Sequence, residues 1–252
     1  IIAFDSFMCR KNGSFYPHVI NFAKLGKVEN LIKYENNDID FEGIFKHFLN
    51  NEITSNLVIA EKVELKNTHP IENGNIALMH IDSPKFYDEL KHVFFRFFPK
   101  LKLGSIIVFQ DYFYHWSATL IAAVQLLKKL NIISFEYSKA SSLCVKVIKL
   151  PKIDDLLLID NEMKSNNVII DLLDNSINQI NEYLIDREGI FVHRLYLAKI
   201  QFLWEIQDFE GATFILSNIF KSNKNLSQNF VDDYFELMKY GFSVRSLYIK
   251  DH

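Results

Sequence analysis

Two kinds of residue are scarce in this sequence, and each scarcity excludes a class of protein. The two cysteines, Cys9 and Cys144, lie far apart and belong to no CxxC or Cys/His pattern, so the sequence indicates neither a disulfide framework nor a zinc site. The eight glycines are dispersed, and no two lie within six residues of each other. A P-loop and a GxGxxG turn are therefore excluded within these residues.

The sequence also lacks an excess of one charge and any long apolar run. Lys and Arg number 28 against 31 Asp and Glu, which gives no electrostatic footprint for nucleic acid or for an acidic membrane surface. No apolar run approaches the roughly 18 residues that span a bilayer. We therefore expect a reduced, cytoplasmic protein whose partner is a small molecule or another protein, and neither nucleic acid nor membrane.

The chain has two parts that meet near Pro151. In residues 1–150, short apolar runs alternate with amphipathic stretches, a pattern typical of a parallel sheet with crossover helices. Residues 151–252 are largely helical in pattern and rich in Asn. We predict an α/β domain over residues 1–150 and an all-helical extension over residues 151–252. Because residue 1 is Ile inside an apolar run, we also expect missing sequence upstream.

Apolar runs and helical periodicity predict the individual elements. Strands are expected at residues 1–4, 56–60, 76–81 and 105–109, in runs typical of strands covered by helices on both faces. Helices are expected at residues 85–98 and 117–130. A short polar link joins two further strands, 132–137 and 143–150, which should therefore be antiparallel. In the extension, helices are expected at residues 168–184, 191–207, 209–221 and 230–240.

Acidic residues follow three of the predicted strands. Asp5 follows the first, Asp82 follows strand 76–81, and Gln110-Asp111 follow strand 105–109. Ligands of an open parallel sheet bind outside the carboxyl ends of its strands, and an acid after the second strand can accept hydrogen bonds from a ribose diol. The alternative for Asp5 is a turn or N-cap residue. The sequence alone leaves both roles open.

Three blocks of the sequence resemble the macrocin O-methyltransferase-like family and its relatives among class I S-adenosylmethionine-dependent methyltransferases. The blocks are residues 4–7 (FDSF), 76–82 (IALMHID) and 104–113 (GSIIVFQDYF). They are similar to the FDSF, HIDxDLY and GxxIVFDEY blocks that end the second, fourth and fifth strands of that family. Residues 132–150 resemble its terminal antiparallel pair, so the resemblance covers most of residues 1–150.

The resemblance implies a Rossmann-like methyltransferase sheet of which this chain holds strands two to seven. The first strand and its glycine-rich turn, which lie at the sheet's centre and hold the methionine end of the cofactor, are not among these residues. The second and fourth strands would then lack their central neighbour and expose unpaired backbone groups. We expect a gap, a rearrangement or a substitute segment at that place.

The resemblance also implies which residues bind S-adenosylmethionine. Asp5, together with Ser6 and Phe7, would bind the ribose, and Asp82 would also contact the cofactor. Residues 61–65, with Val63 at their centre, would lie on the adenine side.

The implied reaction centre contains Asp82, Gln110 and Asp111. These residues would hold Mg²⁺, a hard cation that prefers oxygen ligands and lowers the pKa of a bound hydroxyl. Two acids of the family pattern are absent, because Pro84 and Gln110 stand in their places. Residues 8–12 (MCRKN) also replace an acidic EGLP-like loop of the family.

Two histidines are candidate general bases. His80 lies within strand 76–81, where a packed core role is favoured over catalysis. His115 follows strand 105–109 on the side where an acceptor would enter, and an unperturbed pKa near 6.5 would suit proton removal at neutral pH. The aromatic residues around it form either a wall of the acceptor or adenine site or a lid over the core; they are Tyr112, Phe113, Tyr114 and Trp116.

Two functions from different classes remain open. The first is methyl transfer from S-adenosylmethionine to a hydroxyl of a sugar, polyketide or similar small acceptor. The second is a catalytically degenerate methyltransferase-like scaffold whose helical tail binds a protein partner or a second copy of the chain. A third possibility also stays open: the helical tail belongs to a larger glycan-modifying or multi-domain polypeptide.

Overall fold

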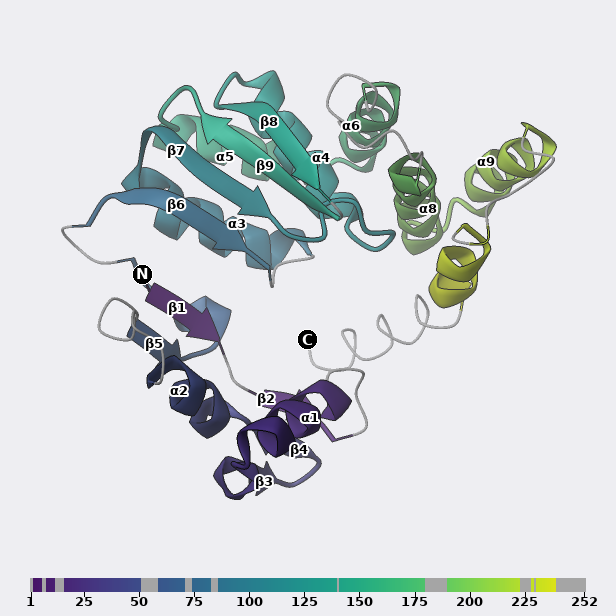
Figure 1. Ribbon diagram of the computed structural model, residues 1–252. Helices are drawn as coiled ribbons and strands as arrows, with labels where there is room; N and C mark the ends of the chain where they lie inside the picture. Colours follow the sequence, from purple (N-terminus) through teal and green to yellow (C-terminus); the bar gives the residue numbers. More distant parts are fainter. Residues whose placement is uncertain are drawn as a thin grey trace. The chain divides into compact units, whose positions relative to one another are not determined.

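A computed structural model describes residues 2–5, 8–11, 16–50, 59–70, 74–82, 86–139, 141–179, 190–222, 228 and 230–238. The chain forms two compact units, Ile1–His69 and Pro70–His252. The elements are labelled in Figure 1. The division into residues 1–150 and 151–252 that the sequence suggests stays a prediction.

The first unit contains two small sheets. Strand β1 (Ile2–Asp5) pairs in parallel with β5 (Ile59–Lys62). Strands β2 (Met8–Arg10), β4 (Asp38–Asp40) and β3 (Lys33–Glu35) form an antiparallel sheet in the order β2-β4-β3. Asn36 has a φ of 53° in the tight turn between β3 and β4, a conformation that Asn tolerates better than most residues.

The described residues of the first unit also form two α-helices, α1 (Tyr16–Gly26) and α2 (Glu42–Asn50). Their buried faces share a core with the antiparallel sheet, and this core contains Val19, Ala23, Val28, Ile32, Ile39 and Ile44. The sequence analysis predicted β1 and β5 to within a few residues. It assigned no element to residues 8–50, where three short strands and both helices lie.

The second unit is an α/β structure with a mixed four-stranded sheet, as the sequence predicts at this coarser level. The strand order is β6-β7-β9-β8, formed by β6 (Ile76–Ile81), β7 (Leu101–Phe109), β9 (Ser142–Val147) and β8 (Ile133–Lys139). Strands β6 and β7 are parallel, whereas β9 is antiparallel to both β7 and β8. The predicted antiparallel pair at the end of the domain is therefore confirmed.

Strand β7 begins four residues earlier than predicted because it contains a bulge. Gly104 has a φ of 83°, a conformation that costs glycine least, and the register with β6 shifts beside it. The buried Ser105 hydroxyl accepts a hydrogen bond from Lys102 N at 2.8 Å and donates one to Ile76 O at 2.6 Å. These two bonds satisfy backbone groups that the shifted register removes from the regular ladder.

Helices of the second unit cover one face of the four-stranded sheet (Figure 1). They are α3 (Tyr87–Phe97), α4 (Ala118–Lys129) and α5 (Ile153–Glu162). Helix α4 is almost entirely buried, as its continuous apolar sequence requires. The described residues leave Leu78 and Leu103 exposed by 68% and 64%, so the expectation of helices on both faces is not met within them.

The helical extension packs against α4 and continues away from the sheet (Figure 1). It contains α6 (Asn166–Asn178), α8 (Ile190–Glu205), α9 (Phe209–Ser222) and a further helix at residues 230–238. Leu197, Ala212 and Phe230 belong to its buried core. C-terminal helices are thus confirmed, whereas α5 was not predicted. In the described residues, no helix combines the length and apolar character that crossing a membrane requires.

The bulge in β7 predicts a specific loss of stability. We expect Ser105→Ala to lower the free energy of unfolding of the second unit by about 1–3 kcal/mol, because two partly buried backbone groups lose their partner. Urea denaturation followed by the fluorescence of Trp116 and Trp204, both in this unit, measures the change. Ser134→Ala is the control, since the Ser134–Glu136 hydrogen bond is exposed; equal losses in the two variants would refute this role of Ser105.

Candidate functional site

The carboxyl ends of β6 and β7 lie together at one edge of the four-stranded sheet. Ile81 is in register with Phe109, and Gln110 N donates a hydrogen bond to Ile81 O at 2.9 Å. Asp82 and Gln110 therefore leave the sheet side by side. The Asp82 side chain is exposed and that of Gln110 is half-buried, so both polar side chains are accessible from solvent.

Asp111 occupies a fixed position in the turn that follows β7. Its φ of 56° lies in the left-handed region, which Asp adopts more readily than most residues. Its Oδ1 accepts a hydrogen bond from Ser141 Oγ at 2.8 Å, and its carbonyl oxygen accepts one from Ser117 Oγ at 2.8 Å. The turn is thus tied both to the start of α4 and to the hairpin between β8 and β9.

The residues predicted to bind the cofactor are divided between the two units. Asp5 ends β1 in register with Lys62, so Val63, which is half-buried, follows β5 at the same end of the parallel pair. Ser6, Phe7 and the Asp5 side chain lie outside the described residues. That these residues converge with Asp82 and Asp111 stays a prediction, because Asp5 belongs to Ile1–His69 and Asp82 to Pro70–His252.

The two histidines differ from their predicted environments. His80 is exposed on β6, so the expectation of a packed core residue is wrong. His115, by contrast, has no exposed surface and stacks on Tyr114 at a ring distance of 4.6 Å. Burial lowers the pKa of His115 to about 4, which keeps the imidazole neutral at neutral pH. In this structure an acceptor in solvent has no access to it.

The aromatic residues after β7 form mainly a lid over the core. Tyr112 and Phe113 are buried, and the Tyr112 hydroxyl is within hydrogen-bond distance of Ser176 Oγ and Gln125 Nε2. Tyr114 and Trp116 are half-buried. Tyr112 and Phe113 therefore agree with the predicted lid over the core rather than with a wall of a ligand site.

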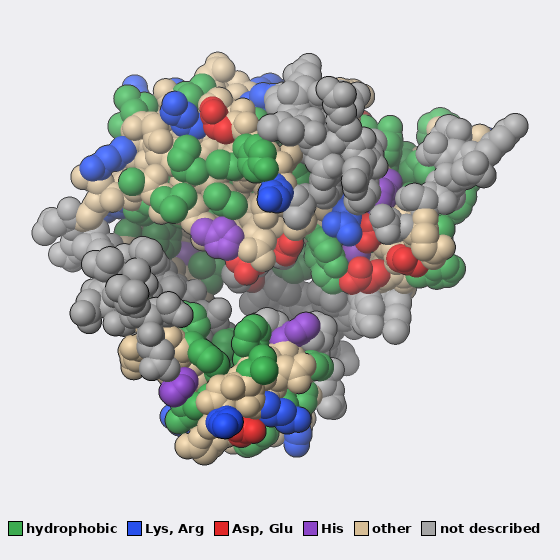
Figure 2. All heavy atoms as spheres, in the orientation of Figure 1, with side chains coloured by type: hydrophobic (Ala, Val, Ile, Leu, Met, Phe, Trp, Pro, Cys, Tyr) green, Lys and Arg blue, Asp and Glu red, His purple; other side chains and the backbone are tan. Residues whose placement is uncertain are grey.

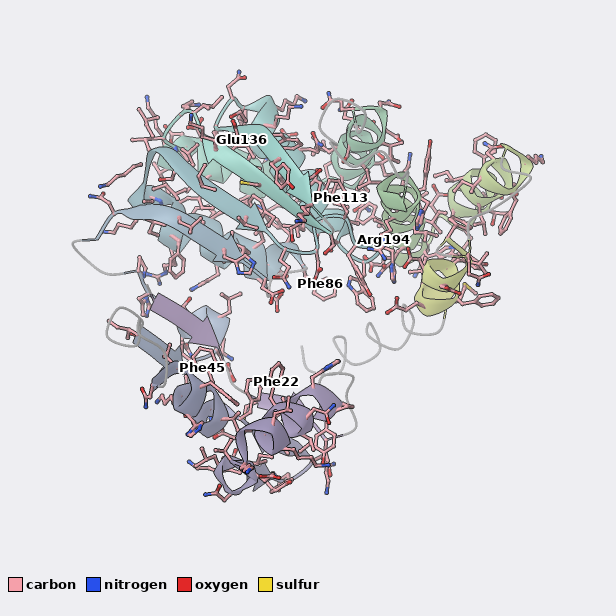
Figure 3. The ribbon with its side chains drawn as sticks, in the orientation of Figure 1. Phe22, Phe45, Phe86, Phe113, Glu136 and Arg194 are labelled. Atoms are coloured by element: carbon pink, nitrogen blue, oxygen red, sulfur yellow. The ribbon has the colours of Figure 1, made fainter. Side chains whose placement is uncertain are left out.

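A cluster of ionisable residues that the sequence analysis did not find surrounds His115. Asp233 accepts hydrogen bonds from Arg194 Nε at 2.8 Å and Nη2 at 3.1 Å, and its Oδ2 lies 2.7 Å from His193 Nε2. Burial opposes the charge on Asp233, but these partners outweigh it and lower its pKa to about 2. Figure 3 shows Arg194 on α8, beside the turn after β7 that carries Phe113.

Glu236 joins this cluster from the helix at residues 230–238. The Tyr114 hydroxyl donates to its carboxylate, with distances of 3.1 and 3.3 Å to the two oxygens. The guanidinium of Arg194 lies 5.5 Å from the centre of the Tyr114 ring, a cation–π distance. No local sequence motif predicts this cluster, because its members are separated by up to 122 residues in the sequence.

Comparisons with protein-family models, with curated proteins and with solved structures each found no match. The assignment of a function therefore depends on the residues and the geometry of this chain.

The buried His115 predicts a dependence of stability on pH. The folded state disfavours protonation of His115, so its contribution is complete above the ordinary pKa of 6.5 and is lost as the pH falls towards 4. The shift corresponds to a loss on the order of 3 kcal/mol. We expect this loss to be absent in His115→Gln, when unfolding free energies are compared between pH 7 and pH 4 with a chelator present.

His80→Gln is the matched control for this prediction, because His80 is exposed. It should follow the wild-type pH profile. If the unfolding free energies of the wild type and His115→Gln fell equally between pH 7 and pH 4, the prediction would be wrong. Protonation of His115 would then not destabilise the folded state.

Proposed function

We propose that this protein is a class I S-adenosylmethionine-dependent O-methyltransferase acting on a hydroxyl of a small molecule such as a sugar or secondary metabolite. The observation that carries the proposal is the pairing of the strands. Parallel β1-β5 and the order β6-β7-β9-β8, with β9 antiparallel, agree with strands two to seven of the Rossmann-like sheet that the resemblance implies. Among the described strands, β1 and β6 each have one neighbour, as expected of strands that flank a central one.

The proposed cofactor site uses the carboxyl ends of these strands. Asp5, Ser6 and Phe7 would bind the ribose, Val63 would lie on the adenine side, and Asp82 would contact the cofactor near the reacting methyl group. The proposal requires the ends of β1 and β6 to face one ligand. A free thiol at Cys144 agrees with a reducing, cytoplasmic location, which we include in the proposal.

The proposed acceptor site lies at the ends of β6 and β7. Asp82, Gln110 and Asp111 present oxygen atoms, which are the ligands that Mg²⁺ prefers, and the Ser141 hydroxyl fixes one oxygen of Asp111. A bound Mg²⁺ would lower the pKa of the acceptor hydroxyl. Since His115 is buried, Asp82 or Asp111 would take the acceptor proton, and His115 would do so only if the residues that enclose it moved away.

Binding of the cofactor tests this proposal. We expect isothermal titration calorimetry of the intact protein to show S-adenosylmethionine binding that Asp5→Ala weakens by about tenfold or more. The physical reason is that hydrogen bonds to a charged group contribute about 1.5–3 kcal/mol each. The matched control is Asp154→Ala, which removes an exposed acid from the first turn of α5. No detectable binding by the wild-type protein would contradict the proposal.

Methyl transfer itself is tested with Asp111→Asn. Asn also adopts a positive φ, so the turn should be retained while the carboxylate is lost. Once an acceptor is found, we expect this change to lower kcat by about 100-fold or more, the usual contribution of a general base, and to leave cofactor affinity unchanged.

A second candidate function, a degenerate methyltransferase-like scaffold, is favoured by the exposed aromatic side chains of the helical extension. On α9, Phe209, Phe214 and Phe220 are exposed by 57%, 68% and 47%. Phe209 and Phe214 also line one shallow surface hollow, and exposed apolar residues that lie together are typical of protein-binding surfaces. The buried His115 and the absence of two family acids agree with a loss of catalysis. In this alternative, α9 would bind a second copy of the chain.

Self-association tests this alternative. We expect analytical ultracentrifugation of the intact protein to show an oligomer that Phe214→Glu dissociates and Phe22→Glu does not, although Phe22 is exposed by 58% in the other unit. A monomeric wild-type protein that binds S-adenosylmethionine would rule the scaffold out in favour of the enzyme.

A further inference from the structure

The turn after β7 and the helix at residues 230–238 enclose a group of potential metal ligands. A ring nitrogen of His115 and carboxylate oxygens of Asp233 and Glu236 all lie within 4.8 Å of one another. His115 and Asp233 are buried and Glu236 is half-buried. The three residues therefore converge on one largely solvent-excluded point within the second unit, and all of them belong to the described part of the chain.

His115 is the independent sign that a ligand belongs at this point. Its side chain is fully buried, and neither ring nitrogen has a hydrogen-bond partner among the described residues. A buried polar group without a partner costs about 1–3 kcal/mol. Burial of His115 therefore destabilises the folded state unless a bound species accepts the lone pair of a ring nitrogen. The two adjacent carboxylates favour a species with positive charge.

We propose that His115, Asp233 and Glu236 form a binding site for one zinc ion or a similar divalent transition metal. Imidazole nitrogen with carboxylate oxygen suits Zn²⁺, whereas Mg²⁺ and Ca²⁺ prefer oxygen alone. Ligand atoms of a tetrahedral zinc ion lie about 3.4 Å apart, given bonds of about 2.0–2.1 Å. The cluster therefore needs to contract by at most about 1.4 Å. With three protein ligands, a water molecule would complete the coordination.

The residues around the cluster also act as supports for its ligands. His193 and Arg194 hold the Asp233 carboxylate from α8, and Tyr114 holds that of Glu236. Such outer hydrogen bonds orient ligands and tune their basicity. Asp233 and Glu236 carry two negative charges, and Arg194 neutralises one of them. The single remaining negative charge favours a cation here, although Arg194 would weaken the attraction.

The consequence of this site is a cross-link between distant parts of the second unit. His115 belongs to the turn after β7, whereas Asp233 and Glu236 belong to the last described helix. A bound ion would fasten that helix over the turn and so keep His115 enclosed. This role does not depend on the proposed cofactor binding, because it involves none of the residues proposed to bind S-adenosylmethionine.

Zinc titration of the intact protein, stripped with a chelator beforehand, tests the proposal. We expect one zinc ion per chain with a dissociation constant below about 1 µM, measured by competition with a chromophoric chelator. His115→Gln and Glu236→Gln should each weaken binding by more than the roughly 10–100-fold that loss of an outer partner causes. Co²⁺ in place of zinc should give visible absorption that His115→Gln abolishes. His69→Gln, at an exposed histidine of the other unit, should bind zinc like the wild type.

The opposite results would overturn the proposal. These are a wild-type dissociation constant above about 100 µM, or equal zinc affinity in the wild type and the two ligand variants. Far-ultraviolet circular dichroism checks that the variants fold. Glu236 is only half-buried, so Glu236→Gln alone decides the question if His115→Gln does not fold. A protein that binds zinc but not S-adenosylmethionine would refute only the proposed function. A protein that binds S-adenosylmethionine but not zinc would refute only the zinc site.

Discussion

The hydrogen bonding of β7 on both of its sides is the constraint on which the second unit depends. β7 is parallel to β6 and antiparallel to β9, so its carboxyl end is fixed relative to Asp82 on one side and to the β8-β9 hairpin on the other. The turn after β7 is fixed as well, because Ser141 and Ser117 donate hydrogen bonds to Asp111 in this turn. The polar side chains that we assign to the two proposed sites of this unit lie at that edge or close to that turn.

Much of the sheet could be predicted because strands and helices of this unit have clear local patterns. The bounds of β6 agree with the apolar run at residues 76–81, and α3 and α4 lie within two residues of their predicted ends. The pair β8 and β9 followed from a polar link too short for a parallel connection. Figure 2 shows hydrophobic side chains, in green, over the four-stranded sheet on the face that the described helices leave uncovered.

Other features could not be predicted because they depend on contacts distant in the sequence. The three-residue strands of the first unit are too short to give a period of two, and β3 is entirely exposed. The early start of β7 depends on the bulge that Gly104 and Ser105 permit. His115 was expected at an open entrance because local sequence gives no sign of a helix more than a hundred residues away that covers it. The candidate zinc site exists only through that long-range packing.

The central proposal is that the acids after β1, β6 and β7 serve one S-adenosylmethionine site. A crystal structure of the intact protein with S-adenosylhomocysteine measures this most directly. Our account predicts the ribose on the carboxylate of Asp5 and the sulfur atom beside Asp82 and Asp111, along a single edge of one sheet. A structure in which these carboxylates point to different faces or to opposite edges would contradict it.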